Sequence, residues 1–364
     1  MISFRFVFLW IALFAVLHRV FRLSYPVIEG NILYYKWNLF WAGILFFPIF
    51  WIACTGPILG DVGTYLGTFD SIPSAWPELV EYLHGLDWSG KGFRLFEGVL
   101  KILFGPDRKV FRIGVALVQS IPLILIYREY SEDYLFSVYL FVAAGCLNSW
   151  MMNGLRQFIA VTLIFAATPF LLQKKYLRLL LVIVVAASFH ISALIMIPIM
   201  FIVQGEAWNR RTILYIIFAV LAAYLFSTRE SLFDMMLVGT EYEGTIEMAE
   251  SWGDDGMNPV RVLVMAAPMI AAFLCRSRLQ KTYNPMINIC INMSVVTTGI
   301  SLIAMVTSGI MTGRLPIYTE LYSYILLPYI LIHGFDYNSR KIMGLMVILL
   351  YMGFYLYGYR NLPA

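Results

Sequence analysis

The stretch that decides the fold class is LRLLLVIVVAASFHISALIMIPIMFIVQ, residues 177–204. A membrane-spanning helix needs roughly 20 predominantly apolar residues, so this run is too long for one crossing and too short for two. His190 and Ser192 interrupt it with polar side chains, and we expect the chain to turn there. A turn inside a membrane is tolerated only where protein or a cavity covers it, so this turn also indicates a site.

Apolar stretches recur from one end of the chain to the other. Of 364 residues, 60% are apolar and only 13% are charged, and the mean hydropathy is +0.77. A soluble domain of this length would carry more charged surface. We expect an all-α, polytopic membrane protein with about 12 transmembrane helices, forming one integral membrane domain over residues 1–364. The predicted helices are 2–18, 38–54, 110–127, 134–149, 155–172, 177–190, 191–204, 212–227, 259–275, 284–308, 317–333 and 342–358.

Basic residues predict the orientation, because short cytoplasmic loops carry an excess of Lys and Arg. Six short loops hold more than half of them: Arg19, Arg22 and Lys36; Arg128; Lys174, Lys175 and Arg178; Arg210 and Arg211; Arg276, Arg278 and Lys281; Arg340 and Lys341. With these loops in the cytoplasm, both termini lie outside, together with two larger segments, 55–109 and 228–258. We expect an interfacial helix at residues 93–104 in the first, and the second is acidic.

Four arginines lie on the predicted external side, where this tendency would have removed them. Arg156 and Arg261 stand near predicted helix starts, Arg314 lies in a tight turn, and Arg94 belongs to the interfacial helix. Guanidinium groups bind a pyrophosphate through paired hydrogen bonds, and helix N-termini add positive potential. We therefore predict that these arginines bind pyrophosphate. The alternative is that each anchors to lipid phosphates or pairs with an external acid.

Four further side chains are candidates for acid–base chemistry or for sugar contacts. His190 at the predicted turn could act as a general base or hydrogen-bond a phosphate or a sugar hydroxyl. Asp61 and Tyr65 are one helical turn apart, so the carboxylate could orient an acceptor hydroxyl beside the phenol; the alternative for Asp61 is a helix N-cap. Glu97 is a weaker acid candidate. Walker loops, Rossmann turns, G-x-S-x-G elbows and metal clusters are not recognisable in the sequence, so we predict no cofactor, no metal and no nucleic acid.

At this point the sequence resembles the EpsG/Wzy family of polysaccharide repeat-unit polymerases. The residues that carry the resemblance are NGLRQFIA at 153–160, a basic loop at 174–175 and ASFHISAL at 187–194. GDVGTYLGTF at 60–69 matches the family's pattern of Gly, Asp, Tyr and Phe after the second helix. Gly92-Phe93 is similar to its G-[YF] motif, and Arg314 to its late external arginine. Two departures are residues 55–59, which lack the usual Arg, and Lys91, where an acid is common.

The resemblance implies a GT-C-like glycosyltransferase in the bacterial cytoplasmic (inner) membrane, with its active site facing the periplasm or the outside. Such enzymes join undecaprenyl-pyrophosphate-linked oligosaccharides into O-antigen, capsule or exopolysaccharide. Arg156 and Arg314 would stabilise the leaving pyrophosphate, and His190 or Asp61 would take the acceptor proton or position its hydroxyl. We expect Tyr65, Gln157 and Glu97 to contact the acceptor sugar. The bilayer, a chain-length regulator and a flippase are the partners that the resemblance implies.

Two other classes of protein fit the same features. A lipid-linked oligosaccharide flippase or other transporter would also need internal cations, although transporters tend to show paired repeats with matching broken helices. An O-antigen ligase would have a similar size and fold, and would transfer a finished chain to a lipid core. The sequence does not indicate the sugar, the linkage formed or the stereochemical outcome.

Overall fold

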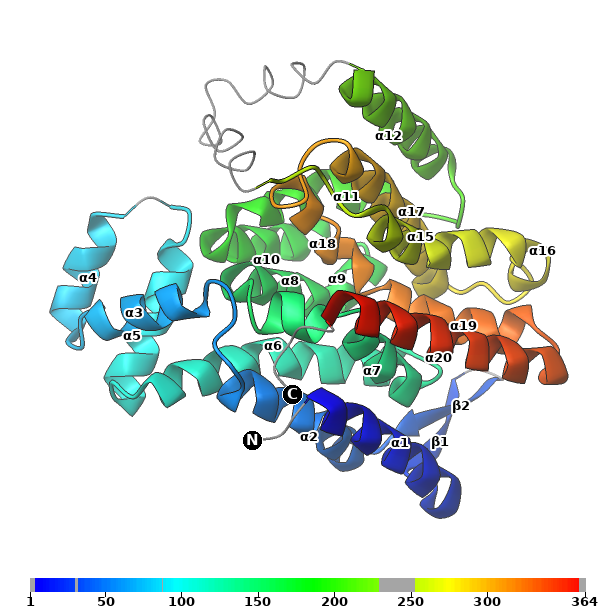
Figure 1. The fold of residues 1–364 in the computed structure, drawn as a ribbon, viewed down its shortest axis with the longest axis horizontal. Coiled ribbons are helices and arrows are strands. Elements are labelled where there is room, and N and C mark those ends of the chain that lie inside the picture. Colours follow the sequence, from blue (N-terminus) through cyan, green and yellow to red (C-terminus); the bar gives the residue numbers. More distant parts are fainter. Residues whose placement is uncertain (1–3, 30–31, 87, 229–252, 360–364) are drawn as a thin grey trace. The chain divides into compact units, whose positions relative to one another are not determined.

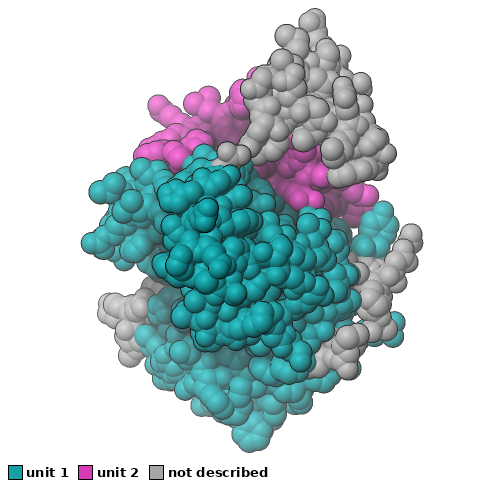
Figure 2. Space-filling model, turned by 90° about the vertical axis from the view of Figure 1, so that its left-hand side faces the viewer, with its two compact units in different colours: residues 1–194, 341–364 teal, residues 195–340 magenta. Residues whose placement is uncertain are grey.

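The computed structural model describes residues 4–29, 32–86, 88–228 and 253–359, which are almost entirely helical (Figure 1). The chain divides into two compact units, coloured teal and magenta in Figure 2. Unit 1 comprises residues 1–194 and 341–364, and unit 2 comprises residues 195–340. The single membrane domain predicted for residues 1–364 remains a prediction, as do its external segments 55–109 and 228–258; residues 229–252 lie outside the described residues.

Unit 1 holds the N-terminal elements and most of the last helix. They are α1 (Phe4–Phe21), β1 (Ser24–Glu29), β2 (Ile32–Trp37), α2 (Leu39–Thr55), α3 (Val62–Ser71), α4 (Trp76–His84), α5 (Lys91–Phe104), α6 (Arg108–Tyr130), α7 (Tyr134–Ala143), the π-helix η1 (Leu147–Met151), α8 (Leu155–Ala166), α9 (Thr168–Leu172), α10 (Tyr176–Phe189), the start of the 3₁₀-helix η2 (Ile191–Ile195) and α20 (Tyr337–Tyr359).

Unit 2 holds the elements between them. They are α11 (Met196–Ile202), α12 (Arg210–Thr228), α15 (Pro259–Leu274), α16 (Arg276–Leu279), α17 (Pro285–Met305), the 3₁₀-helix η3 (Thr312–Arg314), α18 (Ile317–Glu320) and α19 (Ser323–Gly334).

Five helices, α1, α6, α12, α17 and α20, are long and apolar enough to cross a membrane. A sixth span results if Thr312–Glu320 and Ser323–Gly334, which meet at a bend of 51°, are counted together. The other predicted spans coincide with shorter apolar helices: α2, α7, α8, α10, η2 with α11, and α15. The all-α membrane class is confirmed, and the number of twelve spans remains a prediction.

The continuous range predicted at 317–333 was wrong because of this bend between Glu320 and Ser323. Two more predicted helices, 134–149 and 155–172, are also interrupted, so their continuous ranges were wrong. The first stops at Ala143; Gly145 follows with φ +82, a conformation that glycine adopts without steric penalty, and η1 begins two residues later. The second breaks at Ala167, just before α9, which has Pro169 in its first turn. Proline lacks the amide hydrogen that a continuous helix would need there.

An antiparallel hairpin, β1–β2, was not predicted. Its register runs from Ser24 opposite Trp37 to Glu29 opposite Ile32. Arg128 holds its base, donating from Nε to the carbonyl of Trp37 over 2.6 Å and from Nη2 to the hydroxyl of Tyr25 over 2.7 Å. The basic loop between the first two predicted helices is therefore an ordered element.

Asparagine and aspartate side chains stand before several of the described helices. Each accepts a hydrogen bond from an amide of the first turn, which would otherwise lack an acceptor. These N-caps are Asn38, Asp107, Asp133, Asn258 and Asn284.

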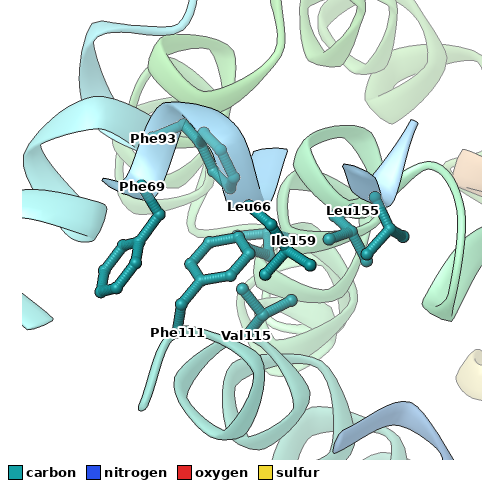
Figure 3. Packing of buried hydrophobic residues seen from close by; sticks show 8 residues of the cluster. Leu66, Phe69, Phe93, Phe111, Val115, Leu155 and Ile159 are labelled. Carbon is teal, nitrogen blue, oxygen red and sulfur yellow. The ribbon is translucent and has the colours of Figure 1, made fainter. Parts of the chain in front are cut away.

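A buried apolar cluster joins α3, α5, α6 and α8 in unit 1. Figure 3 shows its side chains, which are Val62, Leu66, Phe69, Phe93, Phe111, Val115, Leu155 and Ile159. Phe93 packs edge-on against Phe111, with ring centroids 6.1 Å apart. Burial of each such side chain stabilises the folded protein by roughly 1.5–3 kcal/mol. This cluster holds the first turns of α5 and α8 next to one another.

Candidate functional site

Arg156, the second residue of α8, lies against the first turn of α5. Its guanidinium carbon is 5.9 Å from the centre of the Phe93 ring, and its Nε donates to the carbonyl oxygen of Phe189 over 3.3 Å. Gly90 allows this approach, because a Cβ at that position would overlap Nη2 of Arg156. Gly90 also has φ +87, which disfavours any other residue. Gly92 similarly gives room to Ser188 at the end of α10.

Arg94 approaches the same aromatic ring from within α5. Its guanidinium carbon is 5.7 Å from the centre of the Phe93 ring, and Nη1 donates to Oε2 of Glu97 over 2.6 Å. The Glu97 side chain is 0% exposed, whereas that of Arg94 is 20% exposed. Burial raises the pKa of Glu97 to about 7, against the opposing attraction of Arg94 and Arg156. Two guanidinium groups and one buried carboxyl therefore form a charged cluster around Phe93.

The Gly60-Asp61 motif is joined to the start of the motif at 153–160 by one side chain. Oδ1 of Asn153 accepts a hydrogen bond from the amide of Asp61 over 3.1 Å, and Gly60, with φ +47, leaves room for it. The carboxylate of Asp61 is exposed and makes no capping hydrogen bond to α3, although it stands at the N-cap position. Asp61 is therefore the N-cap residue of α3 by position, as the alternative held, but its side chain does not cap the helix.

Tyr65 lies one turn further along α3, as predicted from its spacing to Asp61. Its ring meets that of Phe93 edge-on, with centroids 5.5 Å apart, and its phenol interacts electrostatically with Arg156. Lys101 fixes α3 against α5: its buried ammonium group donates to the carbonyls of Phe69, Asp70 and Ile72 at 3.0, 2.9 and 2.6 Å. These carbonyls lie at the C-terminal end of α3, where no amide of the helix donates to them, so they need a donor from elsewhere.

His190 marks the helix break that the sequence predicted. α10 ends at Phe189, His190 is extended with φ −152 and ψ 119, and η2 begins at Ile191. Nδ1 of His190 lies 2.7 Å from Oγ of Ser192, and Nε2 of Gln157 donates to the same hydroxyl over 3.4 Å. The two motifs at 153–160 and 187–194 are therefore in contact.

Arg261 and Arg314 lie in unit 2. Arg261 is in the first turn of α15 and interacts electrostatically with Glu320, whose Oε1 accepts a hydrogen bond from Tyr324 over 2.5 Å. Arg314 ends η3, a short helix within the turn that follows α17. Unit 1 thus contains seven of the nine predicted site residues, and unit 2 contains these two.

Asp254 fixes the turn that carries Arg314. Its carboxylate accepts hydrogen bonds from Oγ of Ser308 over 2.5 Å and from the amides of Gly309 and Ile310 over 2.8 and 3.2 Å. Partial burial disfavours the ionised form, but these hydrogen bonds outweigh it and hold the pKa of Asp254 below its usual value. Of the eight acids in segment 228–258, Asp254 and Asp255 fall within the described residues.

Sequence reasoning missed three contributors to this site: Gly90, Lys101 and Asp254. The pair Gly90 and Gly92, two residues apart before an amphipathic helix, was a usable indication of close packing. Lys101 and Asp254 gave no indication, since each looks like an ordinary charge on a polar segment.

The sequence profile of the EpsG family matches residues 38–364. The match includes every site residue described above. No curated protein and no solved structure matches the chain.

Proposed function

Because this chain belongs to the EpsG family, we propose that it is a membrane glycosyltransferase that polymerises oligosaccharide repeat units carried on undecaprenyl pyrophosphate. The observation that supports this most is the convergence of Arg94 and Arg156 on the ring of Phe93. The two guanidinium groups also act on each other electrostatically. Such a pair of neighbouring cations suits the two phosphoryl groups of a diphosphate.

In the proposed reaction, a hydroxyl of the acceptor sugar attacks the anomeric carbon of the donor. The bond from that carbon to the diphosphate oxygen breaks, and undecaprenyl pyrophosphate leaves with the electron pair. Arg156 and Arg94 stabilise the negative charge that develops on the leaving oxygen, which is commonly the largest contribution to catalysis of this kind. The acceptor hydroxyl gives up its proton as the new glycosidic bond forms.

Polar side chains beside this cluster are suited to bind sugar. Gln157 and His190 share the hydroxyl of Ser192, so their positions relative to α8 and α10 are fixed. Tyr65 presents an aromatic ring with a polar edge, and Asp61 presents an exposed carboxylate. We assign them to positioning the acceptor, with His190 or Asp61 taking its proton.

Arg314 and Arg261 are further proposed ligands of the pyrophosphate. Arg314 lies in a turn that η3 and Asp254 hold in one conformation. Arg261 has the carboxylate of Glu320 nearby, which balances its charge. The positive-inside tendency supports a catalytic face on the periplasmic or outer side of a bacterial cytoplasmic membrane.

The two alternatives differ from a polymerase in their products. A flippase would move lipid-linked repeats without forming a glycosidic bond, and a ligase would transfer one chain to a lipid core without producing a ladder. The cluster around Phe93 favours an enzyme, since a buried carboxyl with a raised pKa beside paired arginines is typical of a reaction centre.

The test is reconstitution. Purified protein in proteoliposomes, given undecaprenyl-pyrophosphate-linked repeats, should yield a ladder of products that differ by one repeat. Arg156→Ala and Arg314→Ala should remain in the membrane and yield single repeats only. Arg278→Ala is the control, because its pair with Asp336 is exposed. Full-length polymer from both test variants would refute the proposed pyrophosphate site, and flipped but unextended substrate would identify a transporter.

A further inference from the structure

Glu97 is fully buried, whereas its ion-pair partner Arg94 is partly exposed. Its Oε2 accepts the hydrogen bond from Arg94, while Oε1 is inaccessible to solvent and has no hydrogen-bond partner within the described part of the chain. A buried carboxylate normally fills its acceptor sites, and an unfilled one destabilises the ionised form. The ion pair with Arg94 therefore carries most of the stabilisation that keeps Glu97 charged.

Arg94 and Arg156 are the charged groups that act on Glu97. The other elements packed against α5 present neutral side chains there. α3 contributes Tyr65 beside Phe93, and α4 contributes Leu79 against Gly98.

The two remaining neighbours of α5 are also neutral at their contacts. α6 packs Phe111 against Phe93, and α10 packs Ser188 against Gly92 and Phe189 against Phe96. If Arg94 moved away, Arg156 would be the charged group that still acts on Glu97.

We propose that Glu97 is the internal counter-ion of the diphosphate site: an arriving diphosphate takes Arg94 away from Glu97, and the carboxyl group then takes up one proton from solvent. This inference rests on the proposed function, because it assumes that Arg94 binds the substrate's phosphoryl groups. The diphosphate needs no access to Glu97 itself, since the partly exposed guanidinium of Arg94 makes the contact.

Two anions compete for Arg94: the buried carboxylate of Glu97 and the arriving diphosphate. A buried carboxylate without its cation is unfavourable by several kcal/mol, so it protonates instead. Burial already raises the pKa of Glu97 to about 7 while Arg94 still opposes that rise. Loss of Arg94 removes its attraction and its hydrogen bond and leaves only that of Arg156 among the charges that act on Glu97, so the pKa rises further when ligand is bound.

Linkage fixes the sign of the effect. The empty site releases its proton from Glu97 as the pH rises through about 7, whereas the occupied site keeps it. Binding then takes up one proton above that pH, and the affinity should fall about tenfold for each further pH unit. Glu97→Gln resembles the protonated state, so it should bind tightly at every pH in this range.

The experiment measures the affinity of purified protein for a short-chain polyprenyl-diphosphate sugar between pH 6 and 9. Both phosphoryl groups of this probe are diesters and remain ionised throughout. The wild-type affinity should fall with pH, that of Glu97→Gln should stay constant, and Glu81→Gln, an exposed acid on α4, should follow the wild type. A second measurement needs no variant: binding in weak buffer at pH 8 should take up close to one proton per ligand.

The outcomes separate this inference from the proposed function. Tight binding without proton uptake, or a pH dependence that Glu97→Gln shares with the wild type, would refute the role of Glu97 and leave the diphosphate site in place. Absence of binding at every pH would refute the diphosphate site itself.

Discussion

Nε of Arg156 donates a hydrogen bond to the carbonyl oxygen of Phe189, 3.3 Å away. This contact joins the second residue of α8 to the last residue of α10, which are the two helices that carry the motifs at 153–160 and 187–194. Phe189 is the last residue of α10, so no amide of that helix donates to its carbonyl oxygen. The break at His190 therefore has a use: it supplies the oxygen that orients Arg156.

Arg156→Lys should reduce the polymerisation rate about 100-fold or more, although the charge is kept. Lysine lacks the planar group that can donate to Phe189 and to a phosphoryl oxygen at the same time, and removing one charge-stabilising donor commonly costs this much. Arg178→Lys is the matched control. Arg178 also lies 5.9 Å from an aromatic ring centre, that of Phe170, but far along α10 from the site. Ladder formation by each variant measures the difference; equal rates would show that a lone charge suffices.

Gly90→Ala should reduce activity about 100-fold, whereas Gly105→Ala should not. Both positions have φ near +90, +87 and +95 respectively, so both variants lose roughly 1–2 kcal/mol from backbone strain. Only the Cβ at 90 meets Arg156, since the space around Gly105 is open. A displaced catalytic group can cost that factor in rate. Turnover and thermal stability measured together separate the two effects. Equal activity losses in both variants would indicate strain alone.

Lys101→Met should release α3 from α5 and destabilise the protein by about 3 kcal/mol. The substitution keeps the side-chain volume but leaves three carbonyls without their charged donor. Arg108→Ala removes the exposed pair with Asp70 nearby and should change the stability far less. Thermal unfolding in detergent and protease cleavage within residues 59–75 provide the comparison. Similar shifts for the two variants would contradict a special role for Lys101.

Asp254→Asn should destabilise the turn of Arg314 in a pH-dependent way. The folded pKa of Asp254 is below its usual value, so its contribution is present above the unfolded pKa and is lost as the pH falls through the folded one. At pH 7 the variant should lose roughly 1.5–3 kcal/mol, and the gap to the wild type should close in acid. The exposed Asp255→Asn should change little. Thermal unfolding across pH measures this; a constant gap would exclude the carboxylate as its cause.

The helices were predictable because their signal is local. Every predicted apolar range contains helix, and the break at His190 was confirmed. A helix was also predicted at residues 93–104 and is observed as α5, while its interfacial location stays a prediction. The hairpin was missed because its alternating pattern is short, although Gly30-Asn31 between two apolar runs is a recognisable turn signal.

The candidate site was predictable only in its residue types. Arg94 and Glu97 stand three residues apart on one helix, which indicates a pair, but periodicity does not reveal that Glu97 is buried. The contact of Asn153 with Asp61 and the three bonds of Lys101 connect residues far apart in the chain. Such pairings follow from tertiary packing, which no single stretch of sequence contains.

Asp254 anchors the turn of Arg314 within unit 2 through its hydrogen bonds to Ser308, Gly309 and Ile310. The contact with Ser308 joins residues that stand 54 positions apart in the chain, Asp254 before α15 and Ser308 after α17. A change near residue 254 is therefore expected to reach Arg314, although the two are distant in sequence.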